Sequence, residues 1–368
     1  MTQADILVRG AGAVGMAAAL ALSRQGLSVA LLAGMPAVGG PDVRAYALNA
    51  ASVNLLNTLK VWDAIPSDAR TAVHDMHIEG DAAGAALDFS AWTQGVSELA
   101  WIVDAAELEA ALQAALRLSP HVQAVDAELP ATLQVLAEGR DSATRERLGV
   151  TLSRQAYGHR GIAARLLATQ AHGGLARQWF RSPDVLALLP LDRPQPGHGY
   201  GLVWSVPDAR ADELMALPDD DFVAALNDAT GGAAGTLTLA SRRAQWPLAL
   251  AQADRLHGAG WVLVGDAAHL VHPLAGQGLN LGLADVSALA DVIAAREPWR
   301  ALSDERLLAR YARARLGPTL AMARLTDGLL HLFASEQPVV KELRNRGLTL
   351  LNHLPPIKRL LTSRALGG

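Results

Sequence analysis

The spacing of apolar and polar residues changes from segment to segment along this chain. This spacing predicts the order of its helices and strands. Residues 6–8 form a short apolar run, residues 16–25 are rich in Ala and Leu, and residues 27–32 are apolar again. Runs of these lengths predict a buried strand, a helix and a second strand. The chain therefore begins with a unit typical of α/β proteins.

Later segments change character more than once. Residues 73–89 alternate and break at glycines, which predicts a hairpin, whereas residues 122–135 are poorly patterned. Residues 148–217 look rich in β-structure. From Leu279 onward nearly everything predicts helix, with breaks near prolines such as Pro318. This order of segments indicates domains that are interleaved along the chain.

Composition narrows the class of protein. Apolar residues make up 51% of the 368 residues, which is enough for a large core. The net charge of −4 argues against nucleic acid as the main partner, and the absence of cysteine excludes disulfides and thiolate metal sites. We see no signal peptide or membrane-spanning run, so we expect a cytoplasmic protein.

A glycine-rich turn follows the first apolar run. Gly10, Gly12 and Gly15 have G-x-G-x-x-G spacing, with Ala13 and Val14 between the last two. Between a strand and a helix, this spacing is typical of a dinucleotide site, in which backbone approaches a diphosphate at the helix N-terminus. A chance glycine-rich turn is the alternative.

The N-terminal signal lacks one usual feature. An acidic residue commonly follows the second strand and binds ribose hydroxyls, but Ala33 stands there. The site is then either degenerate, or backbone, water or another side chain holds the adenosine end.

A second nucleotide signal lies between Trp261 and Asp285. Its apolar run breaks at Gly265 and Asp266 and ends in a glycine-rich turn before a helix. Two distant parts of the chain therefore look suited to one long phosphate-bearing cofactor.

Together these motifs resemble class A FAD-dependent aromatic monooxygenases, and most closely the ubiquinone-biosynthesis ring hydroxylases. The segments that carry the resemblance are residues 10–15, 42–52, 265–285, and the tail segments 310–329 and 343–348. The family's D-G-x-x-S-x-x-R motif matches residues 138–145 only in altered form, with Glu138 in place of Asp.

The resemblance implies a composite α/β fold, in which a Rossmann-like FAD-binding domain is interleaved with a β-sheet substrate domain. We assign residues 1–70, 98–148 and 258–300 to the FAD-binding domain, 71–97 and 149–257 to the substrate domain, and 301–368 to a C-terminal helical region.

The resemblance also implies the residues that bind FAD. They are Gly10, Gly12, Ala13, Val14, Gly15, Ala33, Arg44, Gly139, Gly265, Asp266, Pro273, Gly276, Gln277, Gly278, Leu279 and Asn280. Asp266 is expected near the ribitol chain or the diphosphate, with a helix N-cap as the alternative. Arg44 is expected to pair with the diphosphate or to border the flavin, and otherwise to be a solvated surface residue.

In such enzymes the flavin performs the chemistry, so no catalytic side chain is assigned. NAD(P)H is the implied reductant and O2 the co-substrate, and a C4a-hydroperoxyflavin hydroxylates an aromatic ring. His272, Pro273 and Trp204 are candidates for the pocket wall, and Trp204 has the protein core as its alternative. A polyprenyl phenol would also need a long apolar groove, which the C-terminal helices are candidates to line.

Other interpretations stay open. His269 and His272 have H-x-x-H spacing, as do His74 and His77, but no third ligand is evident, so we expect no metal site. The chain is alternatively a flavin monooxygenase of another aromatic compound, or a non-catalytic scaffold. The basic and apolar residues 343–364 favour peripheral contact with the inner membrane or with a biosynthetic complex. Self-association is a further expectation.

Overall fold

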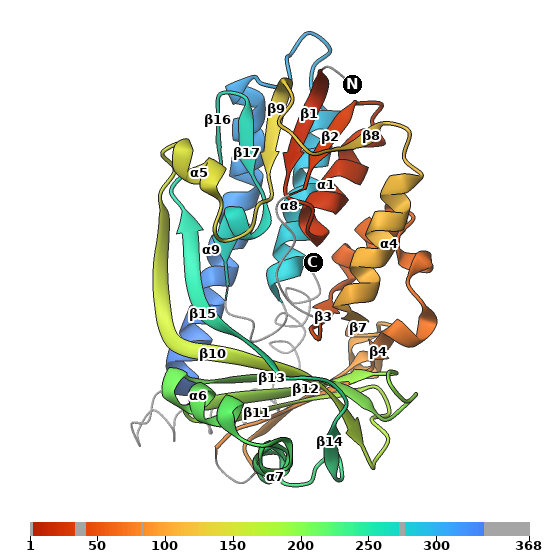
Figure 1. Ribbon diagram of the computed structural model, residues 1–368, viewed down its shortest axis with the longest axis vertical. Helices are drawn as coiled ribbons and strands as arrows, with labels where there is room; N and C mark the ends of the chain where they lie inside the picture. The colour runs from red at the N-terminus through yellow and green to blue at the C-terminus, as the bar shows by residue number, and fades with distance from the viewer. Residues whose placement is uncertain (1–2, 34–41, 82–83, 272–276, 335–368) are drawn as a thin grey trace.

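The computed structural model describes residues 3–33, 42–81, 84–271 and 277–334. It is a mixed α/β structure whose described strands form three sheets (Figure 1). The predicted fold class, a Rossmann-like unit interleaved with a β-rich part, is confirmed.

The first sheet has the strand order β16-β17-β9-β1-β2-β8. Its strands are β1 (Ala4–Arg9), β2 (Val29–Leu32), β8 (Val122–Val125), β9 (Ala131–Leu136), β16 (His257–Gly258) and β17 (Trp261–Leu263). All of these pairs are parallel except β16 with β17. The poorly patterned residues 122–135 therefore contain two strands. β8 gave a weak signal because it is an edge strand with few buried residues.

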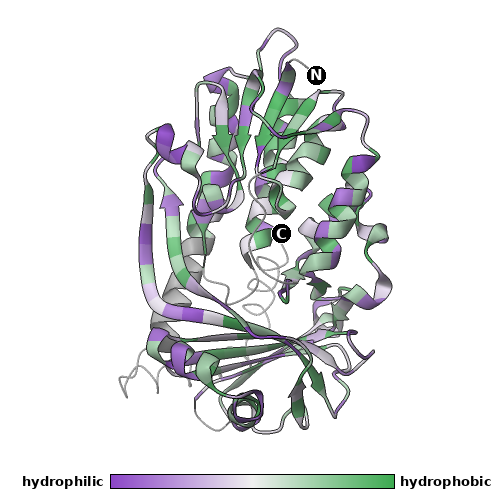
Figure 2. Cartoon of the chain, in the orientation of Figure 1, coloured by the Kyte–Doolittle hydropathy of each residue, from purple (hydrophilic) through white to green (hydrophobic). Residues whose placement is uncertain are grey.

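Helices α1 (Ala13–Ser23), α4 (Ala105–Arg117) and α8 (Gln277–Ala294) share one apolar core with this sheet. Figure 2 colours β1 and α1 mainly as hydrophobic. Nearly every residue of α1 is buried, which explains why it reads as an Ala/Leu run without a polar face.

The second sheet is the largest, with the order β18-β15-β10-β13-β12-β11-β5-β6 and β14 beside β10. Its strands are β5 (Asp75–Glu79), β6 (Ala86–Ser90), β10 (Leu152–Ala168), β11 (Leu175–Arg181), β12 (Asp184–Leu191), β13 (Gly199–Pro207), β14 (Leu237–Leu239), β15 (Ala244–Ala253) and β18 (His269–Leu270). The expected hairpin over residues 73–89 is present as β5 and β6. Hereafter we call this nine-stranded sheet the large sheet.

Helices α6 (Asp208–Ala216) and α7 (Asp219–Thr230) pack on one face of the large sheet (Figure 1). The expected β-rich character of residues 148–217 is present in β10 to β13, and α6 ends this segment. Trp204 is only 1% exposed and lies in the core beneath these helices, where it packs against Phe222. Trp204 therefore takes the core position that was the alternative to a pocket wall.

A small antiparallel sheet of β3 (Ala45–Leu48), β7 (Ala100–Asp104) and β4 (Arg70–Val73) lies between the two larger ones (Figure 1). Helix α2 (Ala50–Thr58) follows β3, and the side chain of Asn49 caps it by accepting the Ser52 N–H. The remaining short helices are η1 (Trp62–Ala64), η2 (Ser67–Ala69), α3 (Ala91–Gln94), α5 (Ala143–Arg147) and η3 (Gly265–Ala267).

The last described helix, α9 (Glu305–Ala334), contains Pro318. The break expected at this proline was wrong. A proline removes one helical hydrogen bond, but the preceding turns of α9 are anchored by the buried side chains of Tyr311 and Arg315. No described helix is both long enough and apolar enough to cross a bilayer.

Candidate cofactor site

The turn between β1 and α1 requires glycine at two positions. Gly10 has a φ of +102°, and a Cβ there would lie 2.3 Å from the Ala137 carbonyl oxygen. A Cβ on Gly15 would lie 1.9 Å from the Gly10 carbonyl oxygen. These contacts let α1 begin directly at the end of β1, as a dinucleotide-binding turn requires.

Gly12 has a different role in the same turn. A Cβ at this position would meet no atom within 4 Å, so open space lies beside it. Gly12 is the N-cap of α1, and no side chain caps the helix there. The first N–H groups of α1, including those near Ala13, are therefore left for an anion.

Val14 connects the two nucleotide signals. A Cβ on Gly265 would lie 3.2 Å from a Val14 methyl group, and one on Gly282 would lie 2.6 Å from the other. The first turn of α1, the turn at η3 and helix α8 therefore meet around one side chain. The structure brings together the motifs that are far apart in the sequence.

A buried ion cluster lies directly behind this meeting point. Asp285 of α8 accepts hydrogen bonds from the Gly265 N–H at 2.9 Å, from His269 Nε2 at 2.7 Å and from Arg315 Nε at 2.6 Å. Tyr311 of α9 donates to the Leu263 carbonyl oxygen at 2.7 Å. Two helices and the end of β17 are thus fixed to the Gly265–Asp266 turn.

The charges in this cluster depend on one another. Burial alone would raise the pKa of Asp285, but His269 and Arg315 outweigh that effect and hold it below the ordinary value. Burial alone would lower the pKa of His269, whereas Asp285 raises it, and the net change is upward. Both shifts favour the charged forms, so the cluster is an ion pair network.

Asn280 joins α8 to the segment after β3. Its Oδ1 accepts from the Asn49 N–H at 3.0 Å and from Ser52 Oγ at 2.7 Å, and its Nδ2 donates to the Ala47 carbonyl oxygen at 2.7 Å. The Asn280 side chain is therefore buried in protein contacts. For this predicted FAD residue, only the backbone is left to face a cofactor.

Asp266 lies in the Gly265–Asp266 turn, close enough to Arg44 for an electrostatic interaction, and both side chains are accessible to solvent. Loss of hydration raises the pKa of Asp266, although His269, Arg44 and Arg140 act in the opposite direction. The Asp266 side chain is nevertheless exposed. The Asp266 carboxylate is therefore accessible, although the surrounding protein disfavours its charge.

Arg44 is the cation near Asp266. Its Nη2 lies 2.6 Å from Asp42 Oδ2, and its guanidinium lies 5.4 Å from the centre of the Tyr46 ring. Burial raises the pKa of Tyr46 to about 12. Arg44 is thus held at the border of the site, with part of its side chain accessible.

The altered middle motif remains intact as a structural unit. Glu138 accepts from Ser142 Oγ at 2.5 Å and from Thr144 Oγ1 at 2.8 Å. The buried Arg145 donates to the Ala267 carbonyl oxygen at 3.2 Å. Glutamate at position 138 therefore still organises the loop, and Arg145 of that loop bonds to η3. Gly139, with a φ of +76°, lies in the same loop.

The remaining predicted residues are placed as follows. Ala33 is exposed at the end of β2, beside the turn whose Gly10 N–H donates to Leu32. Gln277 begins α8, and Gly278 and Leu279 follow it. His272, Pro273 and Gly276 lie outside the described residues.

Sequence reasoning missed three residues that support the site. It gave no structural role to Asp285, Tyr311 or Arg315, because their partners are distant in sequence. For Asp285 the available signal is a charged residue inside a mainly apolar helical stretch, whereas Arg315 lies among several arginines and Tyr311 is uncharged. Buried charges of this kind are rare unless they are paired.

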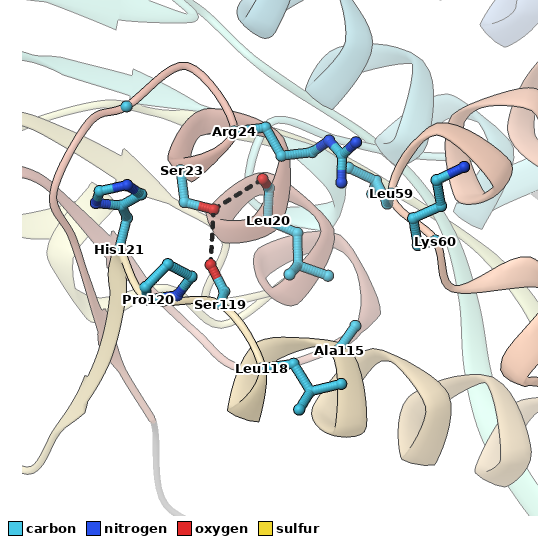
Figure 3. A pocket seen from close by; sticks show the side chains of 11 residues that line it. Leu20, Ser23, Arg24, Leu59, Lys60, Ala115, Leu118, Ser119, Pro120 and His121 are labelled. Atoms are coloured by element: carbon cyan, nitrogen blue, oxygen red, sulfur yellow. Dashed lines mark hydrogen bonds between the residues drawn. The ribbon is translucent and has the colours of Figure 1, made fainter.

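A surface hollow of about 410 Å³ lies elsewhere (Figure 3). It is lined by the C-terminal ends of α1, α2 and α4, where Ser23 Oγ donates to Leu20 and meets Ser119 Oγ. This is the end of α1 opposite to the glycine turn. Arg24 and Lys60 lie where basic residues commonly offset helix dipoles, and the hollow lies away from the candidate cofactor site.

His269, His74 and His77 of the two histidine pairs have protein partners, while His272 lies outside the described residues. His269 binds Asp285, while His77 Nδ1 lies 2.6 Å from Asp88 Oδ1 and His74 Nδ1 lies 3.2 Å from the Ser97 carbonyl oxygen. Within the described ranges, no group of three His, Cys, Asp or Glu side chains is arranged to hold a metal ion.

The His269 pKa predicts a pH dependence of stability. Since the folded pKa lies above the unfolded value of 6.5, the stabilisation is complete below pH 6.5 and is lost as pH rises through the folded pKa. His269→Gln should flatten this loss in urea-unfolding free energies measured across that range. The exposed His121→Gln variant serves as the control, and an unchanged slope in His269→Gln would contradict the assignment.

Comparison with known proteins agrees with this geometry. The chain matches the FAD binding domain family over residues 3–128 and 102–325. It is 31% identical to ubiquinone hydroxylase UbiL of Rhodospirillum rubrum, covering 99% of this chain and 90% of that one. It is 30% identical to 3-demethoxyubiquinol 3-hydroxylase of Escherichia coli, covering 99% and 98%.

Solved structures show the same fold. PqsL of Pseudomonas aeruginosa, in complex with 2-aminobenzoylacetate, superimposes with a TM-score of 0.77 at 21% identity, covering 94% of this chain and 99% of that one. HpxO of Klebsiella pneumoniae, complexed with FAD and uric acid, gives 0.74 at 18% identity, covering 98% and 97%. The chain belongs to the FAD binding domain family and, within it, to the flavin-dependent monooxygenases that include the ubiquinone hydroxylases.

Proposed function

We propose that this monooxygenase hydroxylates the aromatic ring of a ubiquinone precursor. The observation that carries the proposal is near full-length similarity to two ubiquinone-pathway hydroxylases. The overall reaction consumes NAD(P)H, a proton and O2. One oxygen atom replaces a ring hydrogen as hydroxyl, the other leaves as water, and NAD(P)+ is released. Bound FAD supplies the redox chemistry by taking a hydride from NAD(P)H and reacting with O2.

The described residues fit this cofactor. The uncapped N-terminus of α1 and the open space beside Gly12 suit the diphosphate. Asp266 is accessible to accept hydrogen bonds from the ribitol hydroxyls, and Arg44 offers a cation at the border of the site. Gly278 also has open space beside it, which suits close approach of the flavin to the start of α8.

The proposed domain division groups the sheets by role. Five strands of the first sheet and the β1–α1 turn fall in residues 1–70, 98–148 and 258–300, and most strands of the large sheet fall in 71–97 and 149–257. His269–Leu270 (β18) joins the large sheet from within the cofactor segment. The substrate would then lie where the large sheet faces the cofactor site, shielded from water as oxygen transfer requires.

The adenosine end needs a partner that Ala33 does not provide. Leu32 pairs in register with Val125 of the neighbouring strand β8, and Asp126 follows it at the same edge of the sheet. The Asp126 side chain is exposed. Ribose hydroxyls and the adenine amino group are donors that a carboxylate accepts, so we assign the adenosine half to Asp126.

A comparison of FAD with FMN tests both carboxylates. Removing one hydrogen bond to a charged group costs about 1.5–3 kcal/mol, which corresponds to roughly a tenfold or larger rise in Kd. Asp266→Ala should weaken both flavins, because both carry ribitol. Asp126→Ala should weaken FAD alone. Titrations of the apoprotein by flavin fluorescence measure this, with Asp254→Ala as an exposed control, and unchanged flavin content in Asp266→Ala would show the placement to be wrong.

Complementation tests the substrate class. We expect the gene to restore quinone synthesis in one of a set of strains that each lack one ubiquinone hydroxylase, with intermediates identified by mass spectrometry. An Asp266→Ala copy serves as the inactive control. Failure in every strain, with the protein present and yellow, would favour a flavin monooxygenase of another aromatic compound. Colourless protein that cannot be reconstituted with FAD would favour the scaffold.

We also propose peripheral contact with an anionic membrane surface. The support is the mixture of basic and apolar residues over 343–364, which lie outside the described residues. Such binding weakens as salt screens it. The protein should therefore sediment with anionic vesicles at low salt, and Arg344→Gln with Arg346→Gln should reduce this more than Arg24→Gln. Equal sedimentation with neutral vesicles would contradict an electrostatic contact. Docking to a biosynthetic complex and self-association stay predictions.

A further inference from the structure

One arginine connects the large sheet to the segment that carries Arg44. Arg165, on β10, donates through Nη2 to the Arg44 carbonyl oxygen at 2.5 Å and to Asp104 Oδ2 at 2.9 Å. Asp104 uses its other oxygen to cap α4, by accepting from the Ala106 N–H at 2.9 Å. A single guanidinium thus joins β10, the start of β3 and the N-terminus of α4.

The neighbouring strand approaches β3 even more closely. Gly201 of β13 pairs in register with Arg165. A Cβ on Gly201 would lie 2.8 Å from the Ala45 Cβ, and 3.6 Å from Arg165 Nη1. Carbon atoms in contact prefer about 3.5–4.0 Å, so any side chain at position 201 would push β13 and β3 apart by roughly an ångström.

The buried Arg165 guanidinium fixes the positions of the elements that it joins more than it stabilises the fold. Arg165 is 8% exposed, and its Nη1 has no hydrogen-bond partner in the part of the chain that the structure describes. Taking a guanidinium out of water is costly, and apolar residues of similar volume often stabilise such positions equally well. A directional hydrogen-bond donor fixes one distance and orientation between two elements, whereas apolar packing does not.

The two faces of the large sheet therefore differ in role. Arg160, on the same strand, pairs with Asp212 of α6 at 2.5 Å on the helix-covered face. Arg165 and Gly201 lie on the other face, toward the strand that carries the cofactor-site arginine. We propose that Arg165 and Gly201 are positioning residues, which set the distance between the substrate sheet and the cofactor site and thereby the position of the aromatic ring relative to the flavin.

This inference rests on the proposed function, because its consequence concerns oxygen transfer. When the ring is misplaced, NAD(P)H, a proton and O2 yield NAD(P)+ and hydrogen peroxide in place of water and hydroxylated product. A displacement of about 1 Å can reduce the productive reaction on the order of 100-fold. The cofactor turns at Gly10–Gly15 and Gly265–Asp266 do not contain either residue, so FAD affinity should be preserved.

The test compares Arg165→Met and Gly201→Ala with matched controls in the FAD-loaded protein. Arg160→Met changes the same residue type on the same strand, and Gly317→Ala adds a Cβ where no atom lies within 4 Å. With a short-chain prenylphenol as the substrate, product formed per NAD(P)H oxidised should fall at least about tenfold in the two junction variants, with hydrogen peroxide rising to match. Kd for FAD should stay within about twofold. Unchanged coupling in both variants would overturn the proposal.

A second measurement does not depend on the substrate. The Ala105 N–H donates to the same Arg44 carbonyl oxygen at 3.2 Å. Hydrogen exchange at Ala105 and along β3 should therefore speed up in Arg165→Met and Gly201→Ala, but not in the controls. If the wild type hydroxylates no prenylphenol, the proposed substrate is wrong. The hydrogen-exchange rates alone then test whether Arg165 and Gly201 position the two elements. Exchange at the wild-type rate in both variants would then overturn this positioning role.

Discussion

The geometry of the candidate cofactor site depends on one buried carboxylate. Asp285 accepts the Gly265 N–H, His269 and Arg315 at once, and each comes from a different element. A lone buried carboxylate would be prohibitively costly, so its presence requires all of these donors to be in place. The Gly265–Asp266 turn is thereby fixed at the end of β17, and Val14 of α1 can pack beneath it.

This arrangement explains why helix α9 belongs to the candidate site although it carries no nucleotide motif. Arg315 and Tyr311 of α9 reach the carboxylate and the end of β17. Arg145 supports the same turn through the Ala267 carbonyl oxygen. The turn is held from several directions by buried hydrogen bonds, whereas its open side keeps the accessible Asp266. A rigid support with an exposed polar group is what a bound cofactor needs for orientation.

Buried hydrogen bonds also fix the large sheet to the segment before β3, at the junction of Arg165 and Gly201. Apolar packing joins the sheets with little directional preference, whereas a guanidinium shared between a carbonyl oxygen and a carboxylate permits one geometry. An enzyme whose chemistry resides in a cofactor needs its protein for placement above all. The buried polar contacts of Asp285 and Arg165 lie at the two places where the proposed function requires the candidate cofactor turn and the large sheet to be fixed.

The sequence by itself determined the β–α–β start, the glycine turn, the hairpin and the family, because these depend on local spacing and on backbone freedom at particular residues. It assigned no element to residues 122–135, where β8 is an edge strand with little apolar signal, and its break at Pro318 was wrong, since helix packing outweighed one lost hydrogen bond. Only the tertiary structure decided that Trp204 is core, that the Asn280 side chain bonds to β3 and α2, and that Asp285 and Arg165 each join elements that are distant in the sequence. Their partners lie far away along the chain, and a pattern of neighbours cannot reveal a hydrogen bond that folding alone creates.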